Sequence, residues 1–174
     1  MDRIYRKQTP DNPKLIAHRG FSPAAPQNSL AAFRAAGERG FWAIETDVRA
    51  AKDGTLVCCH NDTVDSLYNG EGAVEAFAWE ELSRLRFRDA PEERMPLFSE
   101  YLDICRTYGA VPFIELKTAP VAAVLGQTLE RFAPEELVFS SLRLEHLLEA
   151  RRLCGGVFLH HIFSTPEQAE RLSG

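Results

Sequence analysis

Long apolar runs, basic clusters and a cysteine framework are all missing from this 174-residue sequence. No stretch has the length and apolar character of a bilayer-spanning segment, and the polar start MDRIYRKQTPDNP precedes no signal-peptide core. The formal net charge is -5 and no long basic run occurs. This balance disfavours a nucleic-acid partner, because proteins that bind phosphate backbones usually need a basic face. A small anionic substrate is still compatible, since it requires only a local cationic site.

The few cysteines have the spacing of neither a zinc site nor a disulfide framework. They are Cys58, Cys59, Cys105 and Cys154. We interpret them as small apolar side chains in a reducing compartment, which predicts a cytoplasmic location. The hydrophobic fraction of 45% and the charged fraction of 26% are typical of globular proteins. The length suits a single domain, so residues 1–174 are expected to form one unit.

Short apolar runs alternate with amphipathic stretches along most of the chain. The runs have strand length and are rich in Val, Ile, Leu and Phe: 14–18, 41–48, 55–60, 110–117, 137–140 and 156–163. Helical patterns cover 28–39 (with Asn28 as N-cap), 77–84, 97–108, 120–132 and 143–153, and a short last helix is expected from Thr165. This alternation predicts an α/β fold with a parallel sheet covered by helices.

Two segments depart from the regular alternation. Only six residues, 49–54, join the second apolar run to the third. Neighbouring parallel strands need a longer crossover, so this connection is expected to be irregular. The segment after the third run contains the turn signals Asn69-Gly70 and Gly72, and residues 61–95 are predicted to form a small insertion.

Ionisable residues gather where the predicted strands end. His18 ends the first run, and His60 ends the third. Near the ends of the second and fourth runs lie two pairs with a spacing of two: Glu45 with Asp47, and Glu115 with Lys117. Residues i and i+2 of a strand point to the same face, so the members of each pair are expected to lie together. In α/β folds the carboxyl ends of the strands are where active sites form.

Any one of these residues is most simply read as a solvated charge, a structural histidine or half of an ion pair. Four strand ends that all carry such groups favour one shared site, because burying unpaired charges separately is costly. Three carboxylates offer hard oxygen ligands that suit Mg²⁺ or Ca²⁺. Two imidazoles suit general acid–base catalysis, and Arg19 and Lys117 supply positive charge for a phosphate. These groups together predict metal-dependent phosphodiester cleavage.

The same residues stand in motifs that resemble the glycerophosphodiester phosphodiesterase family. In order, the motifs are His18-Arg19-Gly20, Pro26-Gln27-Asn28-Ser29, Ala32-Phe33, Ile44-Glu45-Thr46-Asp47-Val48, Lys52-Asp53-Gly54-Thr55, His60-Asn61-Asp62 and Phe113-Ile114-Glu115-Leu116-Lys117. The likeness runs from about Leu15 to at least Ser141. It implies a (β/α)₈ barrel of the TIM type, and by the count of six runs the chain is expected to lack the last two strands. It also implies hydrolysis of glycerophosphodiesters to glycerol 3-phosphate and an alcohol, a reaction of lipid and glycerol metabolism.

The resemblance assigns roles to eight residues. It implies that Glu45, Asp47 and Glu115 bind one divalent cation, Mg²⁺ or Ca²⁺, and that His18 and His60 are the acid–base pair. Arg19 and Lys117 would hold the substrate phosphate, and Asn28 would line the pocket. Two positions depart from the family's pattern: Gln27 replaces a usual Glu, and Asn61 replaces a usual Asp.

Two alternatives to simple hydrolysis stay open at this point. A related phospholipase-type enzyme would use the two histidines to form a cyclic phosphate, with the substrate's own hydroxyl as nucleophile. A shortened barrel would also be compatible with an inactive domain that binds phosphoesters. Self-association that covers the incomplete barrel is a further possibility, because open sheet edges invite pairing.

Overall fold

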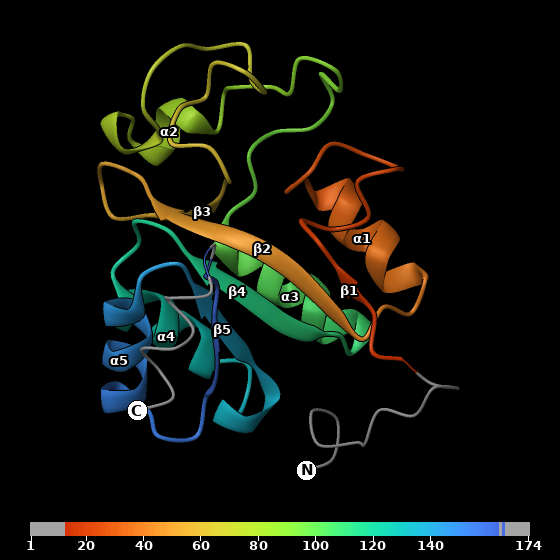
Figure 1. Cartoon of the computed structure of the whole chain (residues 1–174). Helices are drawn as coiled ribbons and strands as arrows, with labels where there is room; N and C mark the ends of the chain where they lie inside the picture. The colour runs from red at the N-terminus through yellow and green to blue at the C-terminus, as the bar shows by residue number, and fades with distance from the viewer. Residues whose placement is uncertain (1–12, 164, 166–174) are drawn as a thin grey trace.

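The computed structural model describes residues 13–163 and 165 of the chain. A parallel sheet in the order β1-β2-β4-β5-β6 forms its centre, and β3 pairs with β2 outside this path (Figure 1). The strands are β1 (Ile16–Ala17), β2 (Ala43–Ala50), β3 (Leu56–Cys58), β4 (Val111–Leu116), β5 (Val138–Ser141) and β6 (Phe158–His161). Each lies within, or within two residues of, a predicted apolar run, so the alternation of strands and helices located all of them.

The third strand differs from the prediction in its direction. β3 runs antiparallel to β2, with Val48 opposite Cys58 and Ala50 opposite Leu56. The six-residue link forms a hairpin in which Ala51 N–H donates to Thr55 O at 2.8 Å. A link of this length closes an antiparallel pair but cannot carry a crossover helix. β3 therefore extends β2 as a hairpin and is not a strand of the parallel barrel wall, which has five strands in the described residues.

The helices follow the predicted patterns with small shifts at their ends. They are α1 (Leu30–Glu38), α2 (Trp79–Leu82), α3 (Phe98–Tyr108), α4 (Val121–Leu129) and α5 (Leu144–Leu153), with short 3₁₀ turns at Val74–Ala76 and Pro134–Glu136. The N-cap of α1 is Ser29, whose Oγ accepts from Ala32 N, and not Asn28 as expected. Asn28 is instead engaged in the site described below. The helix expected from Thr165 lies outside the described residues. Among the described residues, no helix has the length and apolar character needed to cross a membrane.

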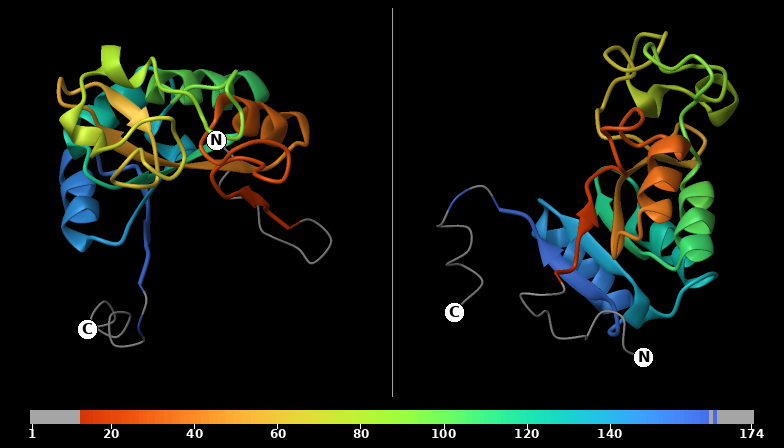
Figure 2. Two further views of the ribbon diagram at one scale, coloured as in Figure 1. Left: turned by 90° about the horizontal axis from the view of Figure 1, so that it is seen from above. Right: turned by 90° about the vertical axis from the view of Figure 1, so that its right-hand side faces the viewer.

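One face of the sheet packs against helices and the other points inward toward the site. On the outer face, Ile44, Val48, Ile114 and Phe139 are fully buried in a core that includes side chains from α1, α3, α4 and α5. Figure 2 shows α1 and α3 stacked on one side of the sheet. The alternating residues of the same strands face the other way. The sheet thus separates an apolar outer core from a face that carries the polar residues.

Strand register arranges the inward-facing residues in rows. The lower row consists of register partners from β2, β4, β5 and β6: Glu45, Phe113, Val138 and Phe158. The row above, toward the carboxyl ends of the strands, consists of Asp47, Glu115, Ser140 and His160. In the lower row, Phe113, Val138 and Phe158 form a small apolar cluster with Ala43 and Val111, which lie below it. The inward face therefore has an apolar floor beneath a polar row.

The segment that follows β3 packs around an apolar cluster of its own. Val64, Tyr68, Val74, Leu82 and Phe87 are all buried there, and the Tyr68 and Phe87 rings lie 4.4 Å apart between centroids. Figure 1 shows this segment, which includes α2, above the hairpin at the carboxyl end of β2. The segment falls within residues 61–95, for which the small insertion stays a prediction.

Candidate active site

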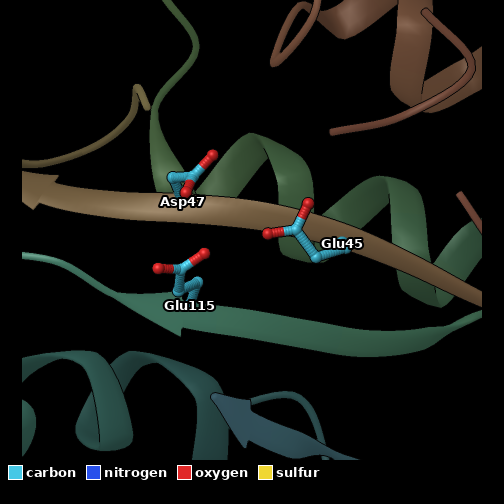
Figure 3. Close-up of side chains that lie close together, drawn as sticks. All are labelled: Glu45, Asp47 and Glu115. Atoms are coloured by element: carbon cyan, nitrogen blue, oxygen red, sulfur yellow. The ribbon is translucent and has the colours of Figure 1, made fainter. Parts of the chain in front are cut away.

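Three buried carboxylates from two neighbouring strands form the centre of the site. Glu45 and Asp47 lie on β2 and Glu115 lies on β4, and one oxygen atom of each falls within 4.8 Å of the others. The residues are 5%, 0% and 7% exposed, respectively. Figure 3 shows the three side chains on the same side of the two strands, with α3 behind the sheet. The i, i+2 spacing and the β2–β4 register thus bring these acids together.

The loop after β1 positions Arg19 against two of the carboxylates. Arg19 has a φ of 56°, in the left-handed region that non-glycine residues rarely adopt. This conformation points its backbone N–H at Glu45 Oε2, 2.7 Å away, and its Nε lies 3.3 Å from Asp47 Oδ2. Gly20 follows with a φ of 78°, and a Cβ there would lie 2.7 Å from the backbone of Ala32 in α1. The loop therefore needs glycine at this position to pack against the helix.

Asn28 holds Asp47 from the other side. It is 1% exposed, and its Nδ2 donates to Asp47 Oδ2 at 2.9 Å. Its Oδ1 accepts from the Thr46 hydroxyl at 2.8 Å. Like Arg19 it has a positive φ, of 55°. Arg19 and Asn28 thus both adopt a strained backbone conformation and both contact Asp47. Such strain at two contacts of one carboxylate indicates a functional constraint on it. Thr46 stands within the motif 44–48, but its type carries no charge and predicted no role in the site.

Lys117 compensates part of the negative charge. Its Nζ lies 2.5 Å from Glu115 Oε1 and 3.2 Å from Asp47 Oδ1. Two cations, Arg19 and Lys117, therefore face three carboxylates. Burial, followed by the neighbouring Asp47 carboxylate, raises the pKa of the Glu45 carboxyl to about 8. The protein alone thus favours a protonated Glu45 near neutral pH.

The two histidines reach the site by different routes. His18 follows β1, and its Nε2 lies 4.0 Å from Glu45 Oε2, with 70% of the side chain exposed. Burial lowers the pKa of His18, and Arg19 lowers it further. His60 follows β3, which the antiparallel hairpin turns back toward Asp47: Cys59 N–H donates to Asp47 O at 3.0 Å. The hairpin, and not a fourth parallel strand end, therefore brings His60 to this region.

Gln27 and Asn61, which replace the usual Glu and Asp of the family that the motifs resemble, both contact site residues. Gln27 Oε1 accepts a hydrogen bond from Arg19 Nη1 at 2.7 Å, so the amide fixes the guanidinium without a charge. Asn61 Oδ1 lies 2.8 Å from His60 Nδ1, and Asn61 Nδ2 donates to Ser66 Oγ at 2.7 Å. Because Oδ1 can only accept, this contact places a proton on His60 Nδ1 and leaves Nε2 available.

The carboxylate cluster fits a hard divalent cation. Asp47 Oδ1 is buried and makes no hydrogen bond within the described residues, and its one close partner there is the Lys117 ammonium at 3.2 Å. A buried carboxylate oxygen without a hydrogen bond is costly, and a metal ion at that position would satisfy it. The donors are all carboxylate oxygens, a set that suits Mg²⁺ or Ca²⁺ better than a soft metal. Glu45, Asp47 and Glu115 are the residues that would hold the ion.

Comparison with known proteins identifies the family. The model of the glycerophosphoryl diester phosphodiesterase family matches residues 18–169. A glycerophosphodiester phosphodiesterase from Caldanaerobacter subterraneus subsp. tengcongensis is 40% identical over 112 residues, which cover 62% of this chain and 46% of that protein. Human glycerophosphodiester phosphodiesterase 1 is 34% identical over 114 residues, covering 62% of this chain and 34% of that protein.

Solved structures agree with these sequence matches. A phosphodiesterase from Oleispira antarctica, solved in complex with the product sn-glycerol-3-phosphate, superposes with a TM-score of 0.85 at 28% identity. The match covers 92% of this chain and 71% of that chain. A glycerophosphodiester phosphodiesterase from Agrobacterium tumefaciens gives a TM-score of 0.78 at 27% identity, covering 84% and 65% of the two chains.

This chain belongs to the glycerophosphoryl diester phosphodiesterase family, and its sheet is part of a TIM-type barrel. Both the family and the fold class expected from the motifs are confirmed. The matched segment spans less than half the length of the curated relatives described above.

Proposed function

We propose that the chain hydrolyses glycerophosphodiesters to glycerol 3-phosphate and an alcohol, with the help of one divalent cation. The observation that carries the proposal is the convergence of Glu45, Asp47 and Glu115 within 4.8 Å beside two histidines and two cations. Family membership supports the reaction class. The product seen with the Oleispira antarctica relative, sn-glycerol-3-phosphate, supports the choice of substrate.

The carboxylates would hold Mg²⁺ or Ca²⁺ at the inward face of β2 and β4. When bound, such an ion stabilises negative charge on phosphoryl oxygens during cleavage. Arg19 and Lys117 provide the protein's own positive charge beside it and suit the substrate phosphate. Asn28 and Gln27 position the groups that act there: Asn28 holds Asp47, and Gln27 holds the Arg19 guanidinium.

His18 and His60 are proposed as the acid–base pair. The lowered pKa of His18 favours the neutral imidazole, the form that takes a proton from an attacking water. We therefore assign His18 as general base. His60, oriented by Asn61, would then protonate the alkoxide that leaves when the phosphorus–oxygen bond breaks. The water oxygen ends on the phosphate, and the alcohol leaves with the proton.

The test uses the purified chain with glycerophosphocholine, with Mg²⁺ or Ca²⁺ and with EDTA. We expect metal-dependent release of glycerol 3-phosphate, followed by phosphorus NMR. His18→Ala and His60→Ala should each lower kcat by roughly 10²–10⁴-fold. His146→Ala, on the outer helix α5, is the matched histidine control and should retain activity.

Three results would contradict parts of the proposal. Wild-type turnover in both histidine variants would remove them from catalysis. A cyclic phosphate product would show that a substrate hydroxyl, not water, is the nucleophile. Metal binding without turnover would identify a phosphoester-binding domain that lacks activity.

We propose two further properties, a cytoplasmic location and self-association. The four cysteines are free thiols, three of them buried, which supports a cytoplasmic location. Within the described residues, β1 and β6 are the edge strands of the parallel sheet, which supports self-association across these edges. Measuring the mass of the protein in solution tests the second point, and a monomer would contradict it.

A further inference from the structure

The polar row that carries two of the carboxylates continues beyond them. Asp47 on β2 is the register partner of Glu115 on β4, Glu115 of Ser140 on β5, and Ser140 of His160 on β6. Partners in neighbouring parallel strands point to the same face of a sheet. Ser140 and His160 therefore face inward with the carboxylates. Neither residue has a role in the function proposed above.

Ser140 and His160 form a hydrogen-bonded pair on this face. Ser140 Oγ lies 3.1 Å from His160 Nδ1. Ser140 is fully buried, whereas His160 is exposed. The Phe113 ring packs edge-on against the imidazole, with centroids 5.4 Å apart and an interplanar angle of 63°. Two contacts thus fix the ring, and its Nε2 is the nitrogen left for a ligand.

The residues that follow Ser140 and His160 face the helix-covered side of the sheet. Ser141 and His161 are also register partners, but they face the other side of the sheet. Ser141 Oγ donates to Leu116 O at 3.1 Å and lies 3.3 Å from His146 Nδ1 of α5. Ser141 is thus bound into the helix-covered side. Its neighbour Ser140 is bound to an exposed imidazole on the side of the carboxylates.

We propose that His160, held by Ser140, binds the hydroxyl groups of the glycerol moiety of the substrate. This inference rests on the proposed function and extends it by naming a contact for the end of the substrate away from the metal. Two strand spacings, about 10 Å, separate the Cα atoms of Glu115 and His160. Both side chains project inward, so the polyol of a substrate whose phosphate lies at the carboxylates has room to extend along the row to His160. A neutral imidazole nitrogen is a suitable donor or acceptor for a hydroxyl.

Calorimetry with two ligands in the presence of Mg²⁺ tests the contact. The ligands are sn-glycerol 3-phosphate and propyl phosphate, which has the same carbon chain and phosphate but lacks both hydroxyls. We expect the wild-type chain to bind glycerol 3-phosphate about tenfold more tightly, the amount that one net hydrogen bond provides. His160→Ala should abolish this preference and leave the affinity for propyl phosphate unchanged. Ser140→Ala should reduce the preference, because the ring loses its anchor.

His161→Ala is the matched control, since it removes a neighbouring histidine from the opposite face and should keep the preference. If His160→Ala does not fold, as judged by circular dichroism, His160→Phe replaces it, because a ring without nitrogen also cannot bind a hydroxyl. In the hydrolysis assay, His160→Ala should raise KM for glycerophosphocholine about tenfold with kcat nearly unchanged.

The outcomes separate this inference from the proposed function. Equal preference for glycerol 3-phosphate in the wild type and in the His160 variant overturns the inference, even if the wild type is an active hydrolase. A wild type without any preference between the two ligands also overturns it. A wild type that lacks turnover but shows the His160-dependent preference supports the contact and overturns only the hydrolase.

Discussion

Replacing Glu45 with Gln is expected to remove a pH dependence from the stability of the metal-free protein. The Glu45 side chain is 6% exposed, and burial, reinforced by Asp47, raises its pKa from 4.5 to about 8. A carboxyl with a higher pKa in the folded chain binds its proton more tightly there than in the unfolded chain. Its contribution to stability is therefore fully present below about pH 4.5 and is lost as the pH rises to about 8.

The size of the effect follows from the shift. Each pKa unit corresponds to about 1.4 kcal/mol, so the full shift is worth about 5 kcal/mol. This figure is an upper limit, because relaxation of the site and entry of water lower the cost of a buried charge. Between about pH 5 and pH 8 the wild-type free energy of unfolding should fall by up to about 1.4 kcal/mol per pH unit relative to Glu45→Gln.

Urea unfolding in EDTA at several pH values measures this difference. Glu80→Gln serves as a control, because the Glu80 side chain is 79% exposed and lies far from the carboxylate cluster in sequence and on another element. Its profile should parallel that of the wild type. If the profiles of the wild type and Glu45→Gln are parallel over the same range, the folded protein holds Glu45 ionised, and the reasoning from burial is refuted.

Two other substitutions test how the site and its support are held. Asn28→Ala removes the hydrogen bonds to Asp47 and Thr46 and places Ala at a positive φ. We expect the free energy of unfolding in urea to fall by about 2–4 kcal/mol. Calorimetry should show roughly 10–100-fold weaker Mg²⁺ binding. Asn28→Gly separates the two causes, since it should recover about 1–2 kcal/mol by relieving the backbone alone, and equal stability of the two variants would contradict this. Tyr101→Phe removes a buried hydroxyl that donates to Ile44 O and accepts from Phe113 N–H. This variant should lower the free energy of unfolding by about 1–3 kcal/mol. Tyr108→Phe, at an exposed tyrosine, should leave the free energy of unfolding unchanged. Equal stability of both tyrosine variants would show that the Tyr101 hydroxyl bonds carry no net stabilisation.

The parts of the site that lie on regular strands were predictable from the sequence. The alternation of a strand places Glu45 and Asp47 on one face without reference to any other part of the chain, and likewise Glu115 and Lys117. The order of the apolar runs was also sufficient to predict a parallel α/β sheet. These features follow from the local periodicity of the sequence, so they can be predicted without the tertiary structure.

The loops and the pairing of strands were not predictable in the same way. Asn28 looked like a helix cap because Asn is a common N-cap residue, yet its side chain bonds Asp47, nineteen positions away, and Ser29 caps the helix instead. The six-residue link before β3 predicts an irregular connection, and only the structure shows that it forms an antiparallel hairpin. His60 therefore reaches the site from a different direction than expected.

The sequence by itself determined the family and predicted that Glu45, Asp47 and Glu115 lie together, because short motifs and strand periodicity are local properties of the chain. Only the tertiary structure revealed the row that joins Asp47 and Glu115 to Ser140 and His160. These four residues come from four strands, and only the register between the strands makes them neighbours. Likewise, the positive φ of Arg19 and the raised pKa of Glu45 arise from packing between distant segments. Such packing is a property of the assembled sheet, and no local pattern in the sequence specifies it.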